Sequence, residues 1–399
     1  MMKFFLACLG LISVFAAYPY RASRAQNQSF NLMGRWRVEF KFSGDREHTL
    51  RFDADSQGKG AFLLLDAISN LLPPPEPTKS QWEQVAPDQV NFSGDIEFPI
   101  GNVGRDAGTL VFKGRFESAD SISGTVAFFR AGQDQKDPGT VPAKTGDFTA
   151  KRATTSSATN VSAASYKGDA LASGAIVTAF GSNLAMATQS ATSLPLPDSL
   201  AGTSVTVRLA SGVEFPAPLF YVSKTQVNYL LPAGTVSDAA TITITSADGN
   251  AGAETIRIAE VAPGLFSANS TGEGVAAAYL ARDKSDGARS YEAVAQFDAA
   301  QNKFVPLPID LGPDRGSASD RVYLILFGTG IQGRSSTSAV RATIGGVVTE
   351  VLYAGPQGYF AGVDQVNLYL SRSLAGRGVV DIALVVDGKA ANILQISVR

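Results

Sequence analysis

The only histidine of the sequence, His48, is the first side chain to consider for acid–base chemistry, because imidazole titrates near neutral pH. A serine hydrolase would need this imidazole between a nucleophilic serine and an orienting carboxylate. The Gly-x-Ser-x-Gly segment that often carries such a serine does not occur in the sequence. We therefore expect His48 to face solvent near the start of a strand, and we predict no catalytic residue.

A pair of carboxylates is the other catalytic arrangement that these residues permit, since glycoside hydrolysis needs only two acids at a defined separation. The candidate acids of the N-terminal region are Glu39, Asp53, Asp55, Asp95 and Glu97. Charged residues that alternate with apolar ones usually form the solvent-facing side of a strand. A carboxylate-dependent glycan hydrolase stays open as an alternative, but the alternation favours solvated acids.

The sequence patterns that could indicate a metal site or a phosphate-binding loop are incomplete. One histidine and one cysteine cannot supply the usual ligands of a zinc site. The segment Asp53–Gly58 partly resembles a calcium loop, yet Leu64 stands where such a loop needs a bidentate glutamate, so a β-turn is the better interpretation. Two glycine-rich segments, 328–330 and 345–346, lack the lysine and the following helix of a phosphate loop. We predict no metal and no cofactor.

An apolar stretch from Ala61 to Leu72 leads into the proline run 73–77. It could line the mouth of a barrel that accepts an apolar ligand, or it could fill the barrel core, which is the more common arrangement in a small barrel. The candidate ligand-contacting residues of this region are apolar or aromatic: Trp36, Phe62, Leu64, Leu71 and Trp82.

The elements that would position these residues are strands. In 26–152, apolar and polar residues alternate in Trp36–Phe42, Thr49–Phe52, Thr109–Lys113 and Ser123–Phe129. A period of two indicates half-buried antiparallel strands, so we predict a barrel-like antiparallel β domain over 26–152. The Ser/Thr/Ala-rich segment 153–159 is predicted to be a linker.

An internal repeat organises the remaining residues. Ile176–Leu184 aligns with Leu324–Ile331, and Gln226–Leu231 aligns with Gln365–Leu370. Ala240–Asn250 aligns with Val380–Gly388, and each contains near its end an Asp-Gly pair typical of a hairpin turn. So many short strands need two packed sheets per copy. We therefore predict an all-β protein with two tandem immunoglobulin-like β-sandwiches, 160–262 and 263–399, the second with a polar loop insertion near 280–315.

The N-terminus and the charge balance indicate the compartment. Lys3, the apolar stretch Phe4–Ala17 and the small residues around Ser23–Ala25 are typical of a secretory signal peptide, here 1–25. The only cysteine, Cys8, lies inside it, so we expect an exported chain without disulfides, secreted, periplasmic or at the cell surface. No later apolar run is long enough to span a bilayer. A formal charge of −2 without a basic block argues against a nucleic-acid partner.

The C-terminal region resembles a family known from soil bacteria. The resemblance rests on the segments Asn160–Tyr166, Phe180–Leu184, Leu200–Val207, Ala217–Ser223, Val261–Phe266 and Tyr353–Pro356. They are similar to the C-terminal domain family of Solibacter-type acidobacteria, and each half resembles an IPT/TIG immunoglobulin-like domain. The resemblance covers about 60% of the chain by the repeat boundaries. It implies export and an immunoglobulin-like fold, and it transfers no site residue.

The N-terminal region shows a shorter resemblance. The triplet Gly34-Arg35-Trp36 is similar to the Gly-x-Trp of lipocalin-like (calycin) barrels, in which the indole closes the barrel floor. Gly146–Arg152 would suit a closing strand.

From the poverty of catalytic groups and the tandem repeat we expect an exported, non-catalytic binding or adhesion protein. Its partner would be an extracellular or periplasmic protein or a glycan. The alternatives are the glycan hydrolase described above and a lipocalin-like carrier of a small apolar ligand.

Overall fold

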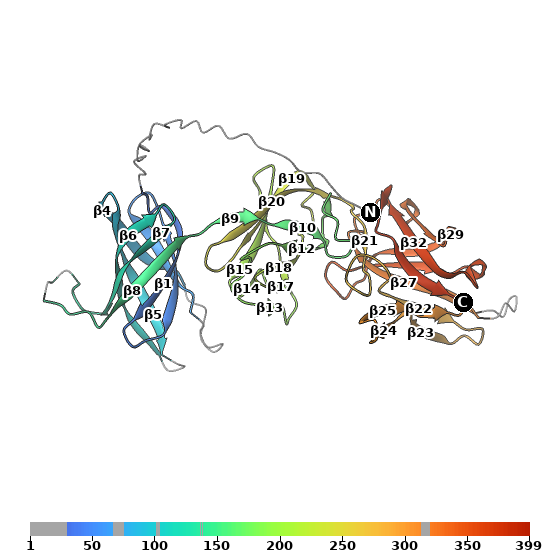
Figure 1. Ribbon diagram of the computed structural model, residues 1–399. Coiled ribbons are helices and arrows are strands. Elements are labelled where there is room, and N and C mark those ends of the chain that lie inside the picture. Colours follow the sequence, from blue (N-terminus) through green and yellow to red (C-terminus); the bar gives the residue numbers. More distant parts are fainter. Residues whose placement is uncertain (1–29, 67–75, 101–103, 136, 138, 313–319) are drawn as a thin grey trace, which may run out of the picture.

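Three β domains follow one another along the computed structural model, which describes residues 30–66, 76–100, 104–135, 137, 139–312 and 320–399 (Figure 1). The predicted signal peptide 1–25 lies outside this range. Among the described residues, no helix is long and apolar enough to cross a membrane. The predicted all-β class is confirmed: a barrel precedes two immunoglobulin-like sandwiches.

The N-terminal domain is a closed barrel in which each strand pairs with the next and the last pairs with the first. All pairs are antiparallel. Its strands are β1 (Gly34–Phe42), β2 (Glu47–Ala54), β3 (Lys59–Leu64), β4 (Thr78–Ala86), β5 (Gln89–Ile100), β6 (Gly104–Ser118), β7 (Ser121–Arg130) and β8 (Lys144–Arg152). Closure leaves no free sheet edge for another chain to pair with.

Phenylalanine rings occupy the interior of the barrel. Phe112 lies 4.5 Å from Phe92, 5.1 Å from Phe148, 5.7 Å from Phe40 and 5.9 Å from Phe62, measured between ring centroids. Ring pairs at such separations add stabilisation beyond the apolar area that they bury. The described part of the barrel therefore has a packed aromatic core.

Trp36 is fully buried at the end of the barrel where the start of β1 pairs with the end of β8. Its indole Nε1 donates a hydrogen bond to the carbonyl oxygen of Leu32 at 2.7 Å. The guanidinium of Arg152 lies 4.3 Å from the centroid of the indole ring and donates to the carbonyl of Asn31 at 2.5 Å. The first and last strands are thus tied together at this end.

The middle domain is a sandwich of two sheets with the orders β10-β12-β18-β17-β13 and β11-β20-β19-β15-β14. Its strands are β9 (Thr155–Ser157), β10 (Thr159–Ser162), β11 (Leu171–Ala172), β12 (Ile176–Phe180), β13 (Gln189–Ser190), β14 (Ser199–Leu200), β15 (Thr203–Leu209), β16 (Glu214–Pro216), β17 (Leu219–Val222), β18 (Gln226–Leu230), β19 (Ser237–Thr245) and β20 (Ala251–Ala259).

The C-terminal sandwich has the orders β23-β22-β27-β31-β30 and β26-β34-β32-β28-β29. Its elements are β21 (Gly264–Leu265), β22 (Ala278–Asp283), β23 (Arg289–Ala293), β24 (Ala295–Asp298), β25 (Lys303–Pro306), β26 (Pro308–Ile309), β27 (Arg321–Thr329), η2 (Thr337–Ala339), β28 (Val340–Ile344), β29 (Val347–Thr349), β30 (Val351–Pro356), β31 (Asp364–Tyr369), η3 (Arg372–Leu374), β32 (Gly378–Val386), β33 (Lys389–Ala390) and β34 (Leu394–Val398).

The two sandwiches share one topology, as the sequence repeat predicted. The order β10-β12-β18-β17 of the middle domain corresponds to β22-β27-β31-β30. In the opposite sheets, β11 pairs in parallel with β20, just as β26 pairs in parallel with β34. Parallel pairing at the same edge of an otherwise antiparallel sheet is a specific feature, so its recurrence supports a duplication.

Two segments differ from their predicted character. The segment 153–159 contains β9, which pairs in parallel with β20, so the connection to the barrel is part of the middle sandwich. In the predicted polar insertion near 280–315, residues 280–309 are not an irregular loop: they contribute to β22, β23 and β26 in the sheets and form the hairpin β24–β25. The alternation there is masked by charged residues such as Arg282, which the fold buries. Residues 313–319 lie outside the described part.

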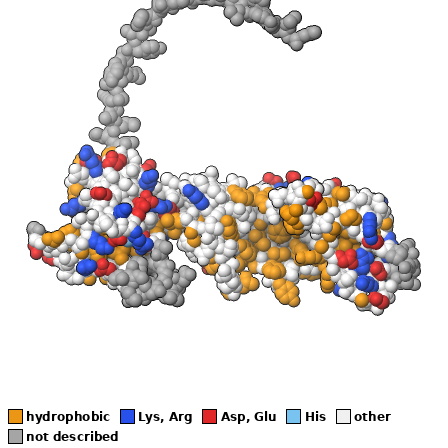
Figure 2. Space-filling view, turned by 60° about the horizontal axis from the view of Figure 1, so that its bottom comes forward, with side chains coloured by type: hydrophobic (Ala, Val, Ile, Leu, Met, Phe, Trp, Pro, Cys, Tyr) orange, Lys and Arg blue, Asp and Glu red, His pale blue; other side chains and the backbone are white. Residues whose placement is uncertain are grey.

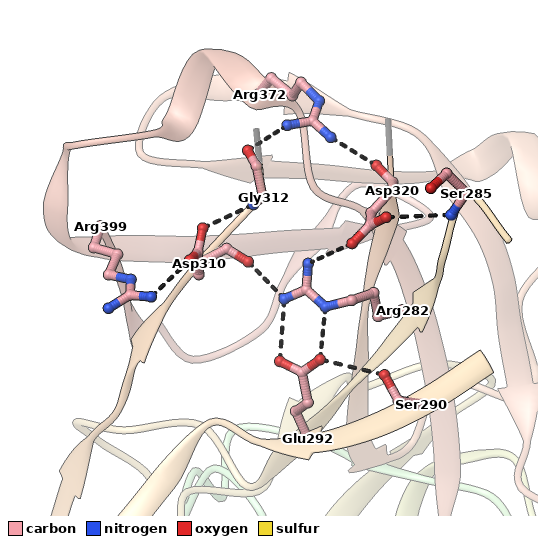
Figure 3. A network of polar contacts seen from close by, with 9 residues as sticks. All are labelled: Arg282, Ser285, Ser290, Glu292, Asp310, Gly312, Asp320, Arg372 and Arg399. Carbon is pink, nitrogen blue, oxygen red and sulfur yellow. Dashed lines mark hydrogen bonds and ion pairs between the residues drawn. The ribbon is translucent and has the colours of Figure 1, made fainter. Parts of the chain in front are cut away.

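A network of charged residues secures the end of the C-terminal sandwich farthest from the barrel (Figure 3). Arg282, with a side chain only 9% exposed, donates twice to Glu292, at 2.6 and 3.1 Å, and lies 3.5 Å from Asp320. Arg372 donates to the carbonyl of Gly312 at 2.6 Å. The hydrogen bond from Arg282 lowers the pKa of Glu292. A buried charge is tolerated when it is paired and hydrogen-bonded in this way.

Each sandwich meets the preceding domain through the same end of its fold. The Asp-Gly-Asn turn between β19 and β20 reaches the barrel, where Asp248 forms an ion pair with Arg37 at 2.9 Å. The corresponding end of the C-terminal sandwich reaches the middle one. There the Thr329 hydroxyl accepts a hydrogen bond from the backbone N–H of Ile176 at 2.9 Å, and the Gln332 side chain donates to the carbonyl of Gly174 at 2.8 Å. The three domains therefore stack in a row.

The ring cluster of the barrel yields a stability prediction. Phe112→Ala removes the ring that contacts four others and should lower the free energy of unfolding of the barrel by about 3–5 kcal/mol. Urea unfolding followed by tryptophan fluorescence measures the change. Lys113→Ala, on the exposed face of the same strand, is the matched control and should stay within about 0.5 kcal/mol of the wild type. Equal effects of the two substitutions would contradict the packed core.

Candidate binding surfaces

The five apolar candidates predicted from the sequence do not meet at an open mouth within the described residues. Trp36, Phe62 and Leu64 are buried in the barrel core. Trp82 is half-buried, packs against the same core and donates from its indole to the carbonyl of Asp55 at 3.0 Å. Leu71 lies outside the described residues. Those that are described serve the core or its edge.

His48 is not the solvent-facing residue that we expected, because its side chain points into the barrel and the residue is only 5% exposed. Its Nδ1 lies 2.6 Å from a carboxylate oxygen of Asp66, and its ring stacks on Phe40 at 5.2 Å. Asp66 also accepts a hydrogen bond from the backbone N–H of Thr49 at 2.9 Å. The side chain of His48 thus lies among aromatic rings and carboxylates of the described residues. The hydrogen bonds of Asp66 join the segment that follows β3 to β2.

The candidate acids of the barrel lie on its outer face or in turns. Glu39, Asp53 and Glu97 form ion pairs with arginines, at 2.8, 2.6 and 3.0 Å. Asp55 accepts hydrogen bonds from the backbone N–H groups of Gln57 and Lys59, both at 2.8 Å, which makes the β-turn predicted in place of a calcium loop. Asp95 accepts a hydrogen bond from the Thr109 hydroxyl at 3.2 Å. Among the described residues, no group of three or more His, Cys, Asp or Glu residues could hold a metal ion.

The repeated Gln-Val-Asn segments place their amides on the outer face of each sandwich. Val227 and Val366 are fully buried, so the residues on either side of each valine point outward. In β18, Gln226 donates to the side-chain oxygen of Asn228 at 2.9 Å. In β31, Gln365 donates to Asn367 at the same distance.

Aromatic residues flank both amide pairs in the same register. In the middle sandwich Phe180 pairs with Gln226, and Tyr221 pairs with Asn228. In the C-terminal sandwich Phe327 pairs with Gln365, and Tyr353 pairs with Asn367. We call these two sets the amide–aromatic face, with the members Phe180, Tyr221, Gln226, Asn228, Phe327, Tyr353, Gln365 and Asn367.

Unused hydrogen-bonding groups remain on this face. In each amide pair, the asparagine nitrogen and the glutamine oxygen make no hydrogen bond to a described residue. This holds for Asn228 and Gln226 and for Asn367 and Gln365. Each set therefore presents two N–H donors on one amide and a carbonyl acceptor on the next, beside aromatic rings. Such a surface can bind a ligand that has both hydroxyl or amide groups and apolar surface.

More aromatic rings extend this face across the junction of the sandwiches. Tyr359 and Phe360, 82% and 68% exposed, lie in the loop before β31. Gly362 of the same loop packs against Ile176 of the middle sandwich. Figure 2, in which the lower side of Figure 1 comes forward, shows hydrophobic side chains gathered over the middle and C-terminal sandwiches, while charged side chains concentrate on the barrel and at the far end. Exposed hydrophobic patches often mark binding sites.

The sequence repeat aligned the two Gln-Val-Asn segments and predicted equivalent strands, without a binding role for their amides. The alternation itself contains the missing signal, because a valine that faces the core requires both amides to face solvent. Each amide also pairs with an aromatic residue on a neighbouring strand, and only the register of the sheets shows this.

No family model matches this chain, and no curated protein is similar to it at a significant level. The geometry therefore defines only a class: a three-domain all-β protein whose tandem sandwiches carry a duplicated amide–aromatic face.

One carboxyl beside this face has an altered pKa. Asp364, the first residue of β31, is 1% exposed, and it accepts hydrogen bonds from the backbone N–H groups of Ile331 at 2.7 Å and Gln332 at 3.2 Å. Burial raises its pKa to about 6, although both backbone donors act in the opposite direction. Its other oxygen has no hydrogen-bond partner among the described residues.

This pKa predicts how stability depends on pH. Because the pKa of Asp364 is about 6 in the folded protein and near 3.8 when exposed, the folded state binds the proton more tightly. The contribution of this proton to the free energy of unfolding is thus present below pH 4 and is lost as pH rises through about 6. The loss is about 1–3 kcal/mol, since one pKa unit corresponds to about 1.4 kcal/mol. Asp364→Asn should remove this loss and stabilise the protein at pH 8, as measured by urea unfolding between pH 4 and 8.

The matched control is Asp238→Asn, whose side chain is 97% exposed. It should keep the pH dependence of the wild type. If Asp364→Asn and the wild type lose stability in parallel between pH 4 and 8, Asp364 does not carry a raised pKa.

Proposed function

We propose that this protein is an exported, non-catalytic binding protein whose tandem sandwiches hold a ligand outside the cytoplasm through the amide–aromatic face. The observation that carries the proposal is that four outward side chains recur in both sandwiches with the same strand register. The predicted signal peptide supports export.

Residues that recur on the outer face of both sandwiches are stronger evidence of a binding role than residues that recur in the core. Inward positions such as Val227 and Val366 are constrained by packing in both copies. Outward positions are free of that constraint and usually vary with little effect on stability. The hydrogen bond within each amide pair contributes about 1 kcal/mol to stability at most, and it requires neither aromatic neighbour. A shared binding role explains the whole set.

The chemistry of the face indicates its ligand class. Neutral amides and aromatic rings favour a ligand that combines hydrogen-bonding groups with apolar surface, which describes both glycans and peptide segments. Two like sets on one chain suit a partner with repeated units, because joined sites raise the overall affinity by their high effective concentration. The packed aromatic core supports a structural role for the barrel rather than the carriage of an apolar ligand.

The proposal predicts the behaviour of two tyrosine variants. Residues 26–399 would be tested on immobilised neutral polysaccharides (cellulose, xylan and starch) and, in parallel, by pull-down of extracellular proteins. Tyr221→Ala and Tyr353→Ala should each weaken binding about tenfold, since a well-placed aromatic contact contributes about 1.4 kcal/mol or more. The double variant should lose more than about a hundredfold, because avidity is lost as well.

The controls are Thr206→Ala and Thr343→Ala, at outward positions of the opposite sheets in β15 and β28. All variants should keep the wild-type melting temperature. The proposal is wrong if the tyrosine variants bind like the threonine variants, or if the wild type binds neither class of partner.

A further inference from the structure

A cleft lies where the barrel meets the middle sandwich, and it is separate from the amide–aromatic face. The barrel contributes the outer side of β1 and β8, with Arg37, Thr149 and Lys151. The sandwich contributes Lys224 before β18 and the loop 183–186 after β12. The cleft has a volume of about 460 Å³, which is in the range of small-molecule sites, and such sites occur preferentially between domains.

Several contacts hold the two walls of this cleft in place. Asp248 accepts from Arg37 across the junction at 2.9 Å and from the side-chain nitrogen of Asn250 at 3.0 Å. The side-chain oxygen of Asn250 accepts from the backbone N–H of Thr154 at 3.1 Å. Gly249, with φ of +90°, lies so close to Arg35 that a β-carbon there would stand 1.9 Å from the arginine Cδ, so only glycine fits. The cleft is therefore preformed, which reduces the entropic cost of binding.

The charges that line the cleft do not balance. Arg37 is neutralised by Glu39 at 2.8 Å and by Asp248. Arg152 is paired with Asp120 at 2.9 Å. Lys151 and Lys224, one from each domain, are exposed, and their ammonium groups have no ion-pair or hydrogen-bond partner among the described residues. Two free ammonium groups thus face one cavity.

Besides its charged residues, the cleft is lined by uncharged polar groups and by a small apolar wall. Thr149 and Thr154 bring hydroxyls, and Asn183 brings an amide, while Ala185 and Met186 form a small apolar wall. Hydroxyls and amides bind the hydroxyl groups of a ligand, and an ammonium group binds a carboxylate by a charge-assisted hydrogen bond. The lining therefore combines an anion site with a site for hydroxyl groups.

We propose that this junction cleft binds an acidic monosaccharide, a hydroxylated ring with one carboxylate, such as a hexuronate. Lys151 and Lys224 hold the carboxylate, the threonine and asparagine side chains hold the hydroxyls, and Met186 packs against the apolar side of the ring. A bare inorganic anion would fill only a small part of the volume and would leave the hydroxyl-binding groups unused. A neutral sugar would leave both ammonium groups uncompensated.

Isothermal titration of residues 26–399 with galacturonate, galactose and inorganic phosphate tests this assignment. Galacturonate should bind, galactose should bind at least about tenfold more weakly, and binding should weaken with added salt, as expected for an ionic contact. Lys151→Gln and Lys224→Gln should each reduce the affinity for galacturonate about tenfold. Glu39→Gln should raise it, because this change removes a competing negative charge from the cleft.

The matched control is Lys113→Gln, an exposed lysine of β6 that does not line this cleft. Its affinity for galacturonate should equal that of the wild type. The assignment is overturned if galactose binds as tightly as galacturonate, if phosphate competes with equal affinity, or if the cleft variants and the control behave alike. None of these results depends on the amide–aromatic face, so this site and the proposed function can fail independently.

Discussion

The burial of alternate side chains in closed or paired sheets is the constraint on which the rest of this structure depends. Every domain places one side of its strands in a core, from the phenylalanine rings of the barrel to the valines and leucines of the two sandwiches. The only cysteine lies in the predicted signal peptide, so we attribute the stability of the three domains to apolar burial and backbone hydrogen bonding. A strand that must keep one side apolar has only its other side left for recognition.

The two candidate sites follow from this division. The amide–aromatic face uses outward positions of β18 and β31, which the core does not need. The junction cleft uses outward positions of β1 and β8 together with loop ends of the middle sandwich. Inside the fold, His48 lies beside the carboxylate of Asp66, and Arg282 is paired with Glu292. Asp364 is the contrasting case, because it is held by two backbone N–H groups and has no cationic partner within hydrogen-bond distance among the described residues.

The two junctions between domains use equivalent parts of the two sandwiches. Each sandwich uses the same end of its fold to meet the domain before it, with Asp248 in the first contact and Thr329 in the second. A duplicated module that carries its own docking end can be added in a row without a new interface. In this row the first sandwich has a different neighbour, the barrel (Figure 1). The junction cleft is lined by residues of these two domains.

Periodicity and repetition in the amino-acid sequence determined the all-β class, the barrel-like first domain and the two sandwiches, because a period of two reports which side of a strand is buried. They did not determine partners across strands. His48 was predicted to face solvent, but in the barrel its position in β2 points inward. There its imidazole has a hydrogen-bond partner in the carboxylate of Asp66, 18 residues further along the chain. Tertiary structure alone decided that Phe180 pairs with Gln226 and that Lys151 and Lys224 line the same cleft, since sheet register and domain contact join residues that local sequence cannot relate.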